Sequence, residues 1–330
     1  MSTQTKSFSR LVLGSPVRLA MPIATYPGLC LTGAKVLDVV TKAQAQVAVQ
    51  VALRERYRSS FLLTAMDLSA EAEAFGCAVM MSDSEVPTVT GRLVAGMEQA
   101  KALAVPTPGD RRTAVYLEAA RGLAALPGNP IVLGGCIGPF SLAARLVGVS
   151  EAMEFTAAEP DLMHILLEKT TAFLTAYLKE FKAAGAAGVI MAEPAAGLLS
   201  PRSMALFSSS YIRQIGKAVG DAQFTVILHN CAAKLVHLPA VLETGLNIFH
   251  FGSPMDLATA LEKVPEEVVL CGNLDPVRVF VQLPPEEVQD RAARLMAVAG
   301  RRKNFVLSSG CDVPPNAPLG SLDAFYRALN

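Results

Sequence analysis

The stretch that decides the fold covers residues 188–230 and reads GVIMAEPAAGLLSPRSMALFSSSYIRQIGKAVGDAQFTVILHN. A short apolar run in 188–194 is followed by a helical pattern in 200–219 and by a second apolar run in 224–230. Near-continuous apolar strands joined by helices are typical of parallel strands that are covered on both faces. The stretch therefore predicts one βαβ unit.

The same alternation extends in both directions. Further strands are predicted at 129–135, 246–252, 267–273 and 304–310. Helices are predicted at 113–126, 160–184, from about 233, at 285–300 and 321–330, with a short one between the strands at 246–252 and 267–273. At least six such units follow one another without a polar linker, which is most simply explained by an α/β fold closed into a (β/α)8 TIM barrel. A doubly wound open sheet is the alternative. We expect a single domain over residues 1–330.

The first hundred residues are less regular than the rest. Residues 34–57 have the pattern of a strong helix, while 75–91 resemble a strand with an irregular extension over one end of the barrel. The expected fold is therefore a barrel with an irregular N-terminal extension.

The composition and charge of the chain bear on whether it binds nucleic acid or a membrane. Hydrophobic residues make up 52% and charged residues 18% of the chain, and 29 basic residues balance 29 acidic ones. Without a basic run, no nucleic acid partner is expected. No stretch reaches 18 apolar residues without Gly, Pro or a charge, and residues 1–18 lack the apolar core of a signal peptide. The expectation is a soluble, cytoplasmic protein with no membrane partner.

The strand at 224–230 ends in an unusual pair of side chains. Alternate strand residues share a face, so His229 points to the same side as Ile227, and Cys231 follows on that side. In a barrel this place is the carboxyl end of a strand, where active sites are assembled. For one such pair alone, a core cysteine beside a hydrogen-bonded histidine is the ordinary interpretation.

A third side chain supports a metal site. Cys311 comes just after the strand at 304–310, before a turn fixed by Pro314 and Pro315. Two cysteines and one histidine form the three-ligand set of catalytic zinc sites, which leave a fourth position open. Zn²⁺ with two thiolates is formally neutral, so it can bind a substrate thiol as a thiolate that stays nucleophilic. The sequence therefore predicts a zinc site at His229, Cys231 and Cys311 that acts on a thiol.

Several motifs resemble one known family. They are MDLSAEAEAFG from Met66, GPFSLA from Gly138, AAGVIMAEPAAGLLSP from Ala186, CGNLDP from Cys271 and SSGCDVPPNAP from Ser308. In this order, together with the His-x-Cys and distant Cys, they resemble the uroporphyrinogen decarboxylase superfamily. The similarity is to its branch of methylcobalamin:coenzyme M methyltransferases and related corrinoid-dependent methyltransferases.

The resemblance implies a fold and an activity. The fold is a distorted (β/α)8 barrel that binds Zn²⁺ through His229, Cys231 and Cys311. The activity is transfer of a methyl group from methylcob(III)alamin, on a small corrinoid protein, to a thiol such as coenzyme M, through a zinc-bound thiolate that leaves cob(I)alamin. Homocysteine or tetrahydrofolate are alternative acceptors, and a non-catalytic corrinoid-binding protein is an alternative function.

The chain also departs from the superfamily. Its decarboxylases use an arginine-rich N-terminal motif to bind substrate carboxylates, but no arginine occurs between Arg18 and Arg54. Glu193-Pro194 replaces the Asp-Pro pair of a central strand. These differences disfavour a uroporphyrinogen-type decarboxylase, which remains an alternative.

Five further residues are weaker candidates for binding substrate or supporting a ligand. Glu193 is either a fourth zinc ligand, an acceptor for an imidazole N–H, or a carboxylate bonded to backbone amides. Asn273 and Asp275 end a strand, but Asp275 is also a suitable cap for the following turn. His250 is a rival ligand, a proton carrier or a packed, hydrogen-bonded histidine, and Asp312 either orients a ligand or shapes its turn. The remaining histidines and three cysteines are expected to be structural: His164, His237, Cys77, Cys136 and Cys271.

Overall fold

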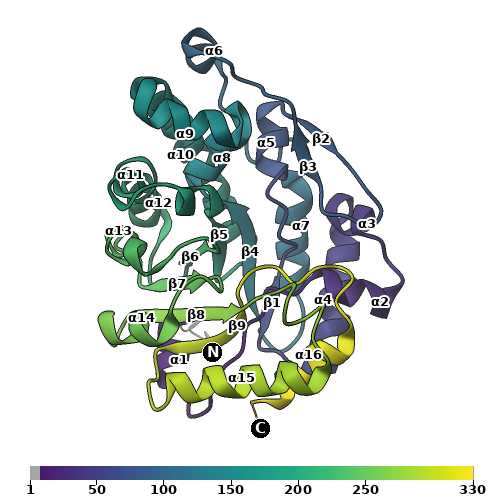
Figure 1. Cartoon of the computed structure of the whole chain (residues 1–330). Helices are drawn as coiled ribbons and strands as arrows, with labels where there is room; N and C mark the ends of the chain where they lie inside the picture. Colours follow the sequence, from purple (N-terminus) through teal and green to yellow (C-terminus); the bar gives the residue numbers. More distant parts are fainter. Residues whose placement is uncertain (1–7, 330) are drawn as a thin grey trace.

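The computed structural model describes residues 8–329, and its centre is a curled sheet of seven parallel strands (Figure 1). The strands are β1 (Phe61–Leu63), β4 (Ile131–Ile137), β5 (Gly188–Ala192), β6 (Thr225–Asn230), β7 (Ile248–Phe251), β8 (Val269–Leu274) and β9 (Phe305–Ser309). Each strand pairs in parallel with the next one in this order. The predicted α/β class with parallel strands is confirmed, and the curled sheet is consistent with a TIM-barrel-like fold.

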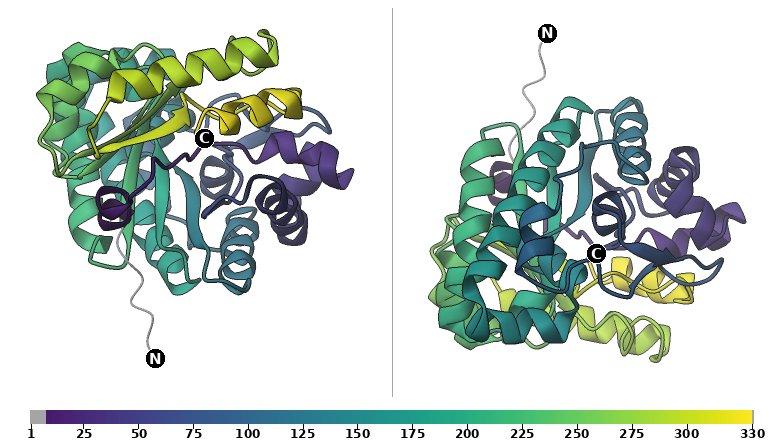
Figure 2. Two further views of the ribbon diagram at one scale, coloured as in Figure 1. Left: turned by 90° about the horizontal axis from the view of Figure 1, so that it is seen from below. Right: turned by 90° about the horizontal axis from the view of Figure 1, so that it is seen from above.

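Helices connect the successive strands or follow the last one, and they form a layer around the sheet (Figure 2). They are α7 (Thr113–Ala124), α8 (Pro139–Val147), α9 (Val149–Ala158), α10 (Pro160–Ala183), η2 (Pro194–Leu198), α11 (Pro201–Met204), the π-helical η3 (Ala205–Ser209), α12 (Ser210–Val219), η4 (Leu235–His237), α13 (Leu238–Leu242), α14 (Leu257–Lys263), α15 (Pro285–Ala299) and α16 (Leu319–Arg327). Along α10, Leu166, Thr170 and Leu174 are buried four residues apart. This apolar stripe explains why the helix predicted at 160–184 forms.

Apolar side chains fill the inside of the curled sheet. Strand residues such as Ile190, Ile227 and Val306 belong to this inner cluster, whereas Leu228, which points the other way, belongs to the outer core under the helices. At one end the cluster includes Phe8 of α1 (Phe8–Gly14), whose ring lies 5.2 Å from that of Phe61 at the start of β1. Helix α1 therefore covers the amino ends of the strands.

The edges of the sheet differ from the predicted eight strands. Residues 19–23 run beside β9, where Met21 N–H donates to Leu307 and Leu307 N–H donates to Leu19. The next N–H facing β9, that of Ile23, donates to the Ser309 side chain at 3.0 Å instead of to a backbone carbonyl, so the regular ladder does not continue. Seven strands therefore make up the parallel sheet in residues 8–329, with an irregular segment beside the last one.

Helix α4 (Ala43–Tyr57) covers the other edge, at β1. Gln50 accepts a hydrogen bond from Leu63 N–H at 3.1 Å, and Gln46 accepts one from Ala65 N–H at 3.0 Å. Both glutamines are buried. Their amides satisfy backbone donors that a neighbouring strand would otherwise bind.

The rest of the N-terminal part lies beside α4 and above β1. It contains η1 (Tyr26–Gly28), α2 (Leu29–Thr32), α3 (Val36–Thr41), α5 (Ala70–Phe75), the antiparallel hairpin of β2 (Ala78–Met80) and β3 (Thr88–Thr90), and α6 (Met97–Ala102), most of them at the top and right of Figure 1. The single helix predicted at 34–57 is two helices, because Lys42 has an extended backbone. The strand predicted within 75–91 is a hairpin.

No helix within residues 8–329 combines the length and apolar character needed to cross a bilayer. The expectation of no signal peptide also involves residues 1–7, which lie outside the described residues.

Candidate metal centre

Three predicted ligands meet at the carboxyl ends of the strands. His229 is the penultimate residue of β6, Cys231 follows that strand, and Cys311 lies two residues after β9. One ligand atom from each lies within 4.8 Å of the others. Since parallel strands end at one edge of the sheet, two segments 80 residues apart in the chain can meet there. The structure brings together the three side chains that the sequence predicted.

Close backbone packing fixes the position of Cys231. Gly252, directly after β7, lies so near that an added Cβ would be 2.7 Å from Cys231 Cα. On the other side, the Asn230 side chain accepts a hydrogen bond from Ala232 N–H at 3.1 Å. This local turn and the absence of a side chain at Gly252 hold the Cys231 backbone in place.

The two thiols interact directly. A hydrogen bond from Cys311 lowers the pKa of Cys231, and the same bond raises the pKa of Cys311. The nearby His229 also lowers the pKa of Cys231, whereas burial opposes this effect. The contact between the two thiols therefore favours a thiolate in this pair. A thiolate is the form of cysteine that binds metals.

His229 has one nitrogen bonded and one free. Its Nδ1 lies 2.8 Å from Nδ1 of His250, which is the residue paired with it on β7. Its Nε2 is buried and has no hydrogen-bond partner. A buried polar atom without a partner costs about 1–3 kcal/mol, so this nitrogen is suited to a ligand. An imidazole nitrogen beside two sulfurs is a donor set that fits Zn²⁺.

Glu193 is placed differently from the three ligands. Directly after β5, its two carboxylate oxygens accept hydrogen bonds from Phe140 N–H, Ser141 N–H and the Ser208 hydroxyl, each at 2.9 Å. Burial raises the pKa of Glu193, and these donors oppose the rise. The side chain thus links β5 to the start of α8 and to η3. Of the three roles considered from the sequence, this arrangement corresponds to a carboxylate bonded to backbone amides.

Asn273 and Asp275 both bond to nearby loops. Asn273 donates to the carbonyls of Gly252 and Met255 at 3.1 and 2.7 Å. Asp275 accepts from Val277 N–H and Arg278 N–H at 3.0 and 2.7 Å, which is the predicted cap geometry at the start of a turn. Neither residue belongs to the metal-ligand group.

Asp312 and His250 flank the centre. Asp312 follows Cys311, and its Oδ1 is buried without a hydrogen-bond partner. Burial raises the pKa of Asp312. His250 is fully buried, and this burial lowers its pKa well below the usual value. It bonds His229 instead of joining the ligand group.

The residues expected to be structural have structural contacts. His164 lies 2.7 Å from the Tyr211 hydroxyl, and His237 bonds Lys234 N–H and the Leu199 carbonyl. The three cysteines expected in the core, Cys77, Cys136 and Cys271, are buried.

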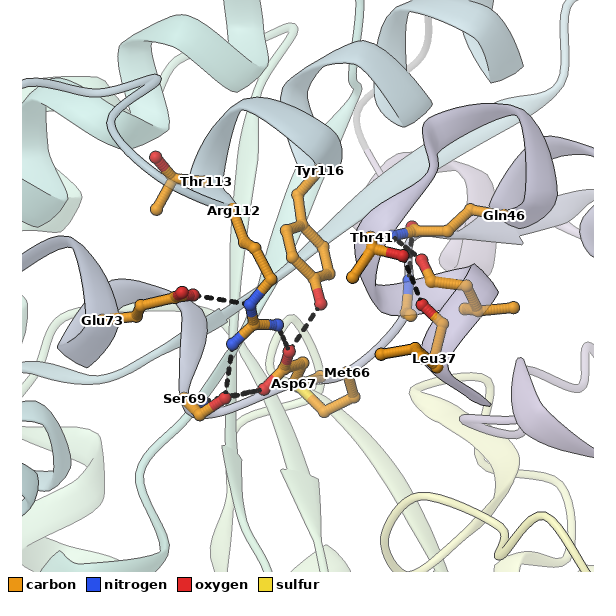
Figure 3. Close-up of polar contacts among 12 residues, drawn as sticks. Leu37, Thr41, Gln46, Met66, Asp67, Ser69, Glu73, Arg112, Thr113 and Tyr116 are labelled. Atoms are coloured by element: carbon orange, nitrogen blue, oxygen red, sulfur yellow. Dashed lines mark hydrogen bonds and ion pairs between the residues drawn. The ribbon is translucent and has the colours of Figure 1, made fainter. Parts of the chain in front are cut away.

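Sequence reasoning missed a buried ionic cluster after β1 (Figure 3). Asp67 forms an ion pair with Arg112 and accepts hydrogen bonds from the Tyr116 hydroxyl at 2.7 Å and the Ser69 hydroxyl at 2.6 Å. Arg112 also bonds Glu73 at 2.5 Å. The only signal for it was an aspartate after the apolar run FLLTAM, because Arg112 is 45 residues away. The cluster joins α7 to the segment that follows β1.

The chain belongs to the uroporphyrinogen decarboxylase family, whose model matches residues 16–330. Within this family, the resemblance to the methylcobamide:CoM methyltransferase branch is supported by two relatives. Methylcobamide:CoM methyltransferase MtbA of Methanosarcina acetivorans is 28% identical over 260 residues, covering 78% of this chain and 75% of the relative. MtbA of Methanosarcina mazei gives the same values over 261 residues. These names support the prediction of a methyltransferase enzyme.

Other similarities concern the family and the fold. Uroporphyrinogen decarboxylase of Salmonella newport is 26% identical over 297 residues, covering 87% of this chain and 83% of that protein. A solved structure described as a methyltransferase from Methanosarcina mazei superposes with a TM-score of 0.88 at 22% identity, covering 99% of this chain and 98% of the other. A B12-independent methionine synthase from Shewanella has a TM-score of 0.56 at 14% identity, with coverages of 94% and 93%. These two likenesses show the fold.

Proposed function

We propose that this protein is a zinc-dependent methyltransferase that moves a methyl group from methylcob(III)alamin, held on a corrinoid protein, to a thiol such as coenzyme M. The supporting observation is the group of His229, Cys231 and Cys311, whose ligand atoms lie within 4.8 Å and include an unpartnered buried nitrogen. The proposal treats residues 1–330 as one barrel domain that acts in the cytoplasm, where cysteines stay reduced.

The ligand set accounts for the chemistry. When bound, zinc supplies Lewis acidity that lowers the pKa of a substrate thiol. His229, Cys231 and Cys311 would hold the ion at the carboxyl ends of the strands, and a three-ligand site of this kind would have room for that sulfur. With two protein thiolates the centre is formally neutral, so the substrate sulfur keeps its electron density. Overall, the thiol loses a proton, its sulfur bonds the methyl carbon, and the donor leaves as cob(I)alamin.

The acceptor is proposed from the names of the relatives. Two relatives at 28% identity are called methylcobamide:CoM methyltransferases, which favours coenzyme M. Homocysteine and tetrahydrofolate are the alternative acceptors. A non-catalytic corrinoid-binding protein is the alternative function that is not enzymatic.

A decarboxylase of porphyrinogen carboxylates is less well supported, although decarboxylases are among the relatives. Such a substrate needs cationic partners, and Arg112 is bound to Asp67 and Glu73. Arg18 donates to backbone carbonyls of the 300–305 segment instead. These two arginines are therefore engaged within the protein.

Metal content and methyl transfer test the proposal. Purified protein should contain about one zinc per chain, as expected for a three-ligand site. With zinc and coenzyme M it should demethylate free methylcobalamin, followed by the absorbance change to cob(I)alamin under anaerobic conditions. Cys311→Ala should lose both properties. Cys30→Ala is the matched control, because Cys30 is exposed and outside the ligand group.

The acceptor alternatives are resolved in the same assay. Homocysteine and tetrahydrofolate replace coenzyme M in parallel reactions, and the fastest acceptor identifies the substrate class. Binding of methylcobalamin without demethylation by any acceptor would favour the binding protein. Wild-type protein that binds no zinc, or Cys311→Ala protein with full activity, would contradict the proposal.

A further inference from the structure

A chain of hydrogen bonds starts at the candidate ligand His229 and ends on the backbone. His229 Nδ1 lies 2.8 Å from His250 Nδ1, and His250 Nε2 lies 2.7 Å from the Ser308 hydroxyl oxygen. The Ser308 hydroxyl donates to the Met21 carbonyl at 2.5 Å. The chain thus crosses the inside of the sheet from β6 through β7 to β9. His229, His250 and Ser308 are all buried.

The last acceptor sets the direction of every bond in the chain. The Met21 carbonyl can only accept, so the Ser308 proton points toward it and the Ser308 oxygen is left to accept from His250 Nε2–H. The His250 ring is fully buried and has no carboxylate among its hydrogen-bond partners, so it carries a single proton. With that proton on Nε2, its Nδ1 is bare and can only accept from His229 Nδ1–H. His229 therefore has its lone pair on Nε2, the nitrogen that has no partner in the protein.

The position of Met21 is itself fixed by the fold. Its N–H donates to the Leu307 carbonyl at 2.9 Å, and Leu307 N–H donates to the Leu19 carbonyl at 3.0 Å. The irregular segment beside β9 therefore holds the carbonyl that orients Ser308. The N-terminal region thereby supplies the last acceptor in this chain of hydrogen bonds.

We propose that His250 and Ser308 are positioning residues that hold His229 in its Nδ1–H tautomer and so keep its Nε2 free to bind the metal. This inference rests on the proposed function, because the tautomer matters only if a metal binds here. In the opposite tautomer of His229, two nitrogen lone pairs would face each other across 2.8 Å. That arrangement loses a buried hydrogen bond and places a proton on the ligand nitrogen.

The same chain argues against His250 as a proton carrier. Proton transfer along it would have to end on the Met21 carbonyl, which has no group beyond it to receive a proton. His250 is also 0% exposed, so solvent does not reach the ring. The chain therefore orients the His229 ring and offers no onward path for a proton.

Two substitutions at His250 separate the tautomer role from a packing role. His250→Asn keeps an acceptor near the position of Nδ1, whereas His250→Leu replaces the ring with an apolar side chain that cannot accept. Ser308→Ala removes the hydroxyl that orients His250. Zinc affinity is measured by competition with a chromophoric chelator, and the tautomer is read from ¹⁵N–¹H spectra of zinc-free protein labelled at histidine. The chain has only four histidines, so the spectra can be assigned with single substitutions.

The expected results are specific to the tautomer. Wild-type His229 shows the Nδ1–H form. His250→Leu shifts it toward Nε2–H and weakens zinc binding by about 10–100-fold, as for other partners of metal-bound histidines. His250→Asn restores the Nδ1–H form and most of the affinity, and Ser308→Ala falls between wild type and His250→Leu.

The outcomes separate this inference from the proposed function. If wild-type protein binds no zinc, the proposed function fails. If wild-type protein binds zinc and His250→Leu keeps both the affinity and the tautomer, the positioning role is wrong. Should His250→Leu not fold, Ser308→Ala with an unchanged tautomer and zinc affinity would overturn the role equally.

Discussion

Replacing Arg112 with methionine tests the buried ionic cluster above β1. In the folded protein, the Asp67 carboxylate is 0% exposed and forms an ion pair with Arg112, which is 8% exposed. Methionine has a similar length but no charge, so Asp67 keeps only the neutral donors of Ser69 and Tyr116. Removing one partner of a buried ion pair costs about 3–5 kcal/mol, because the other charge is left without compensation.

The measurement is urea unfolding followed by circular dichroism at neutral pH. We expect Arg112→Met to lower the free energy of unfolding by about 3–5 kcal/mol. The double variant with Asp67→Asn and Arg112→Met should recover more than about 1.4 kcal/mol of this loss, because the unpaired buried carboxylate is no longer present. The matched control is Arg56→Met. Arg56 is paired with Asp323 but is 41% exposed, so its loss should cost less than about 1 kcal/mol.

Two results would refute this reasoning. The first is that Arg112→Met lowers the free energy of unfolding by no more than Arg56→Met does. The second is a double variant that is no more stable than Arg112→Met. Either result would mean that the cluster is not held by charge compensation.

Three other substitutions give distinct expectations. Gly252→Ala should displace Cys231, costing about 1–3 kcal/mol of stability and weakening zinc binding in chelator competition; unchanged zinc affinity would contradict the close contact. Glu193→Ala should cost at least about 2 kcal/mol in urea unfolding, because three buried donors lose their acceptor, while zinc stoichiometry stays the same; loss of zinc would instead make Glu193 a ligand. Burial raises the pKa of Glu71 to about 8, so the folded protein keeps this proton between pH 4.5 and 8 while the unfolded chain releases it. The free energy of unfolding of the wild type should therefore fall as the pH rises through this window, by up to about 1.4 kcal/mol per pH unit, and the Glu71→Gln variant should lose that dependence. Equal pH profiles of stability for the wild type and Glu71→Gln would contradict this role of Glu71.

The helices and strands after residue 113 could be predicted because each has its own periodic pattern. Helix α10 has apolar residues three and four apart, and β6 is apolar up to His229, so neighbours in the chain are enough to define them. The three-residue strand β1 was not predicted, since so short an apolar run has no period. It is completed by the glutamines of α4, which lie elsewhere in the chain.

The ligand types and their spacing were also visible in the sequence, whereas the roles of the neighbouring polar residues were not. Glu193 and Asp275 are of a residue type that is common in functional sites, but their carboxylate oxygens accept hydrogen bonds from nearby backbone N–H groups. Hydrogen-bond partners of this kind depend on three-dimensional position. His250 was a candidate ligand in the sequence and is a neighbour of a candidate ligand in the structure.

By itself, the sequence determined the parallel α/β class and the residues His229, Cys231 and Cys311, because strand alternation and chemical type are local properties. Only the tertiary structure decided that these side chains meet, that residues 19–23 accompany β9, and that Asp67 pairs with Arg112. Those contacts join segments tens to hundreds of residues apart. The partners, burial and direction of each hydrogen bond are fixed only when the sheet curls and brings these distant segments together.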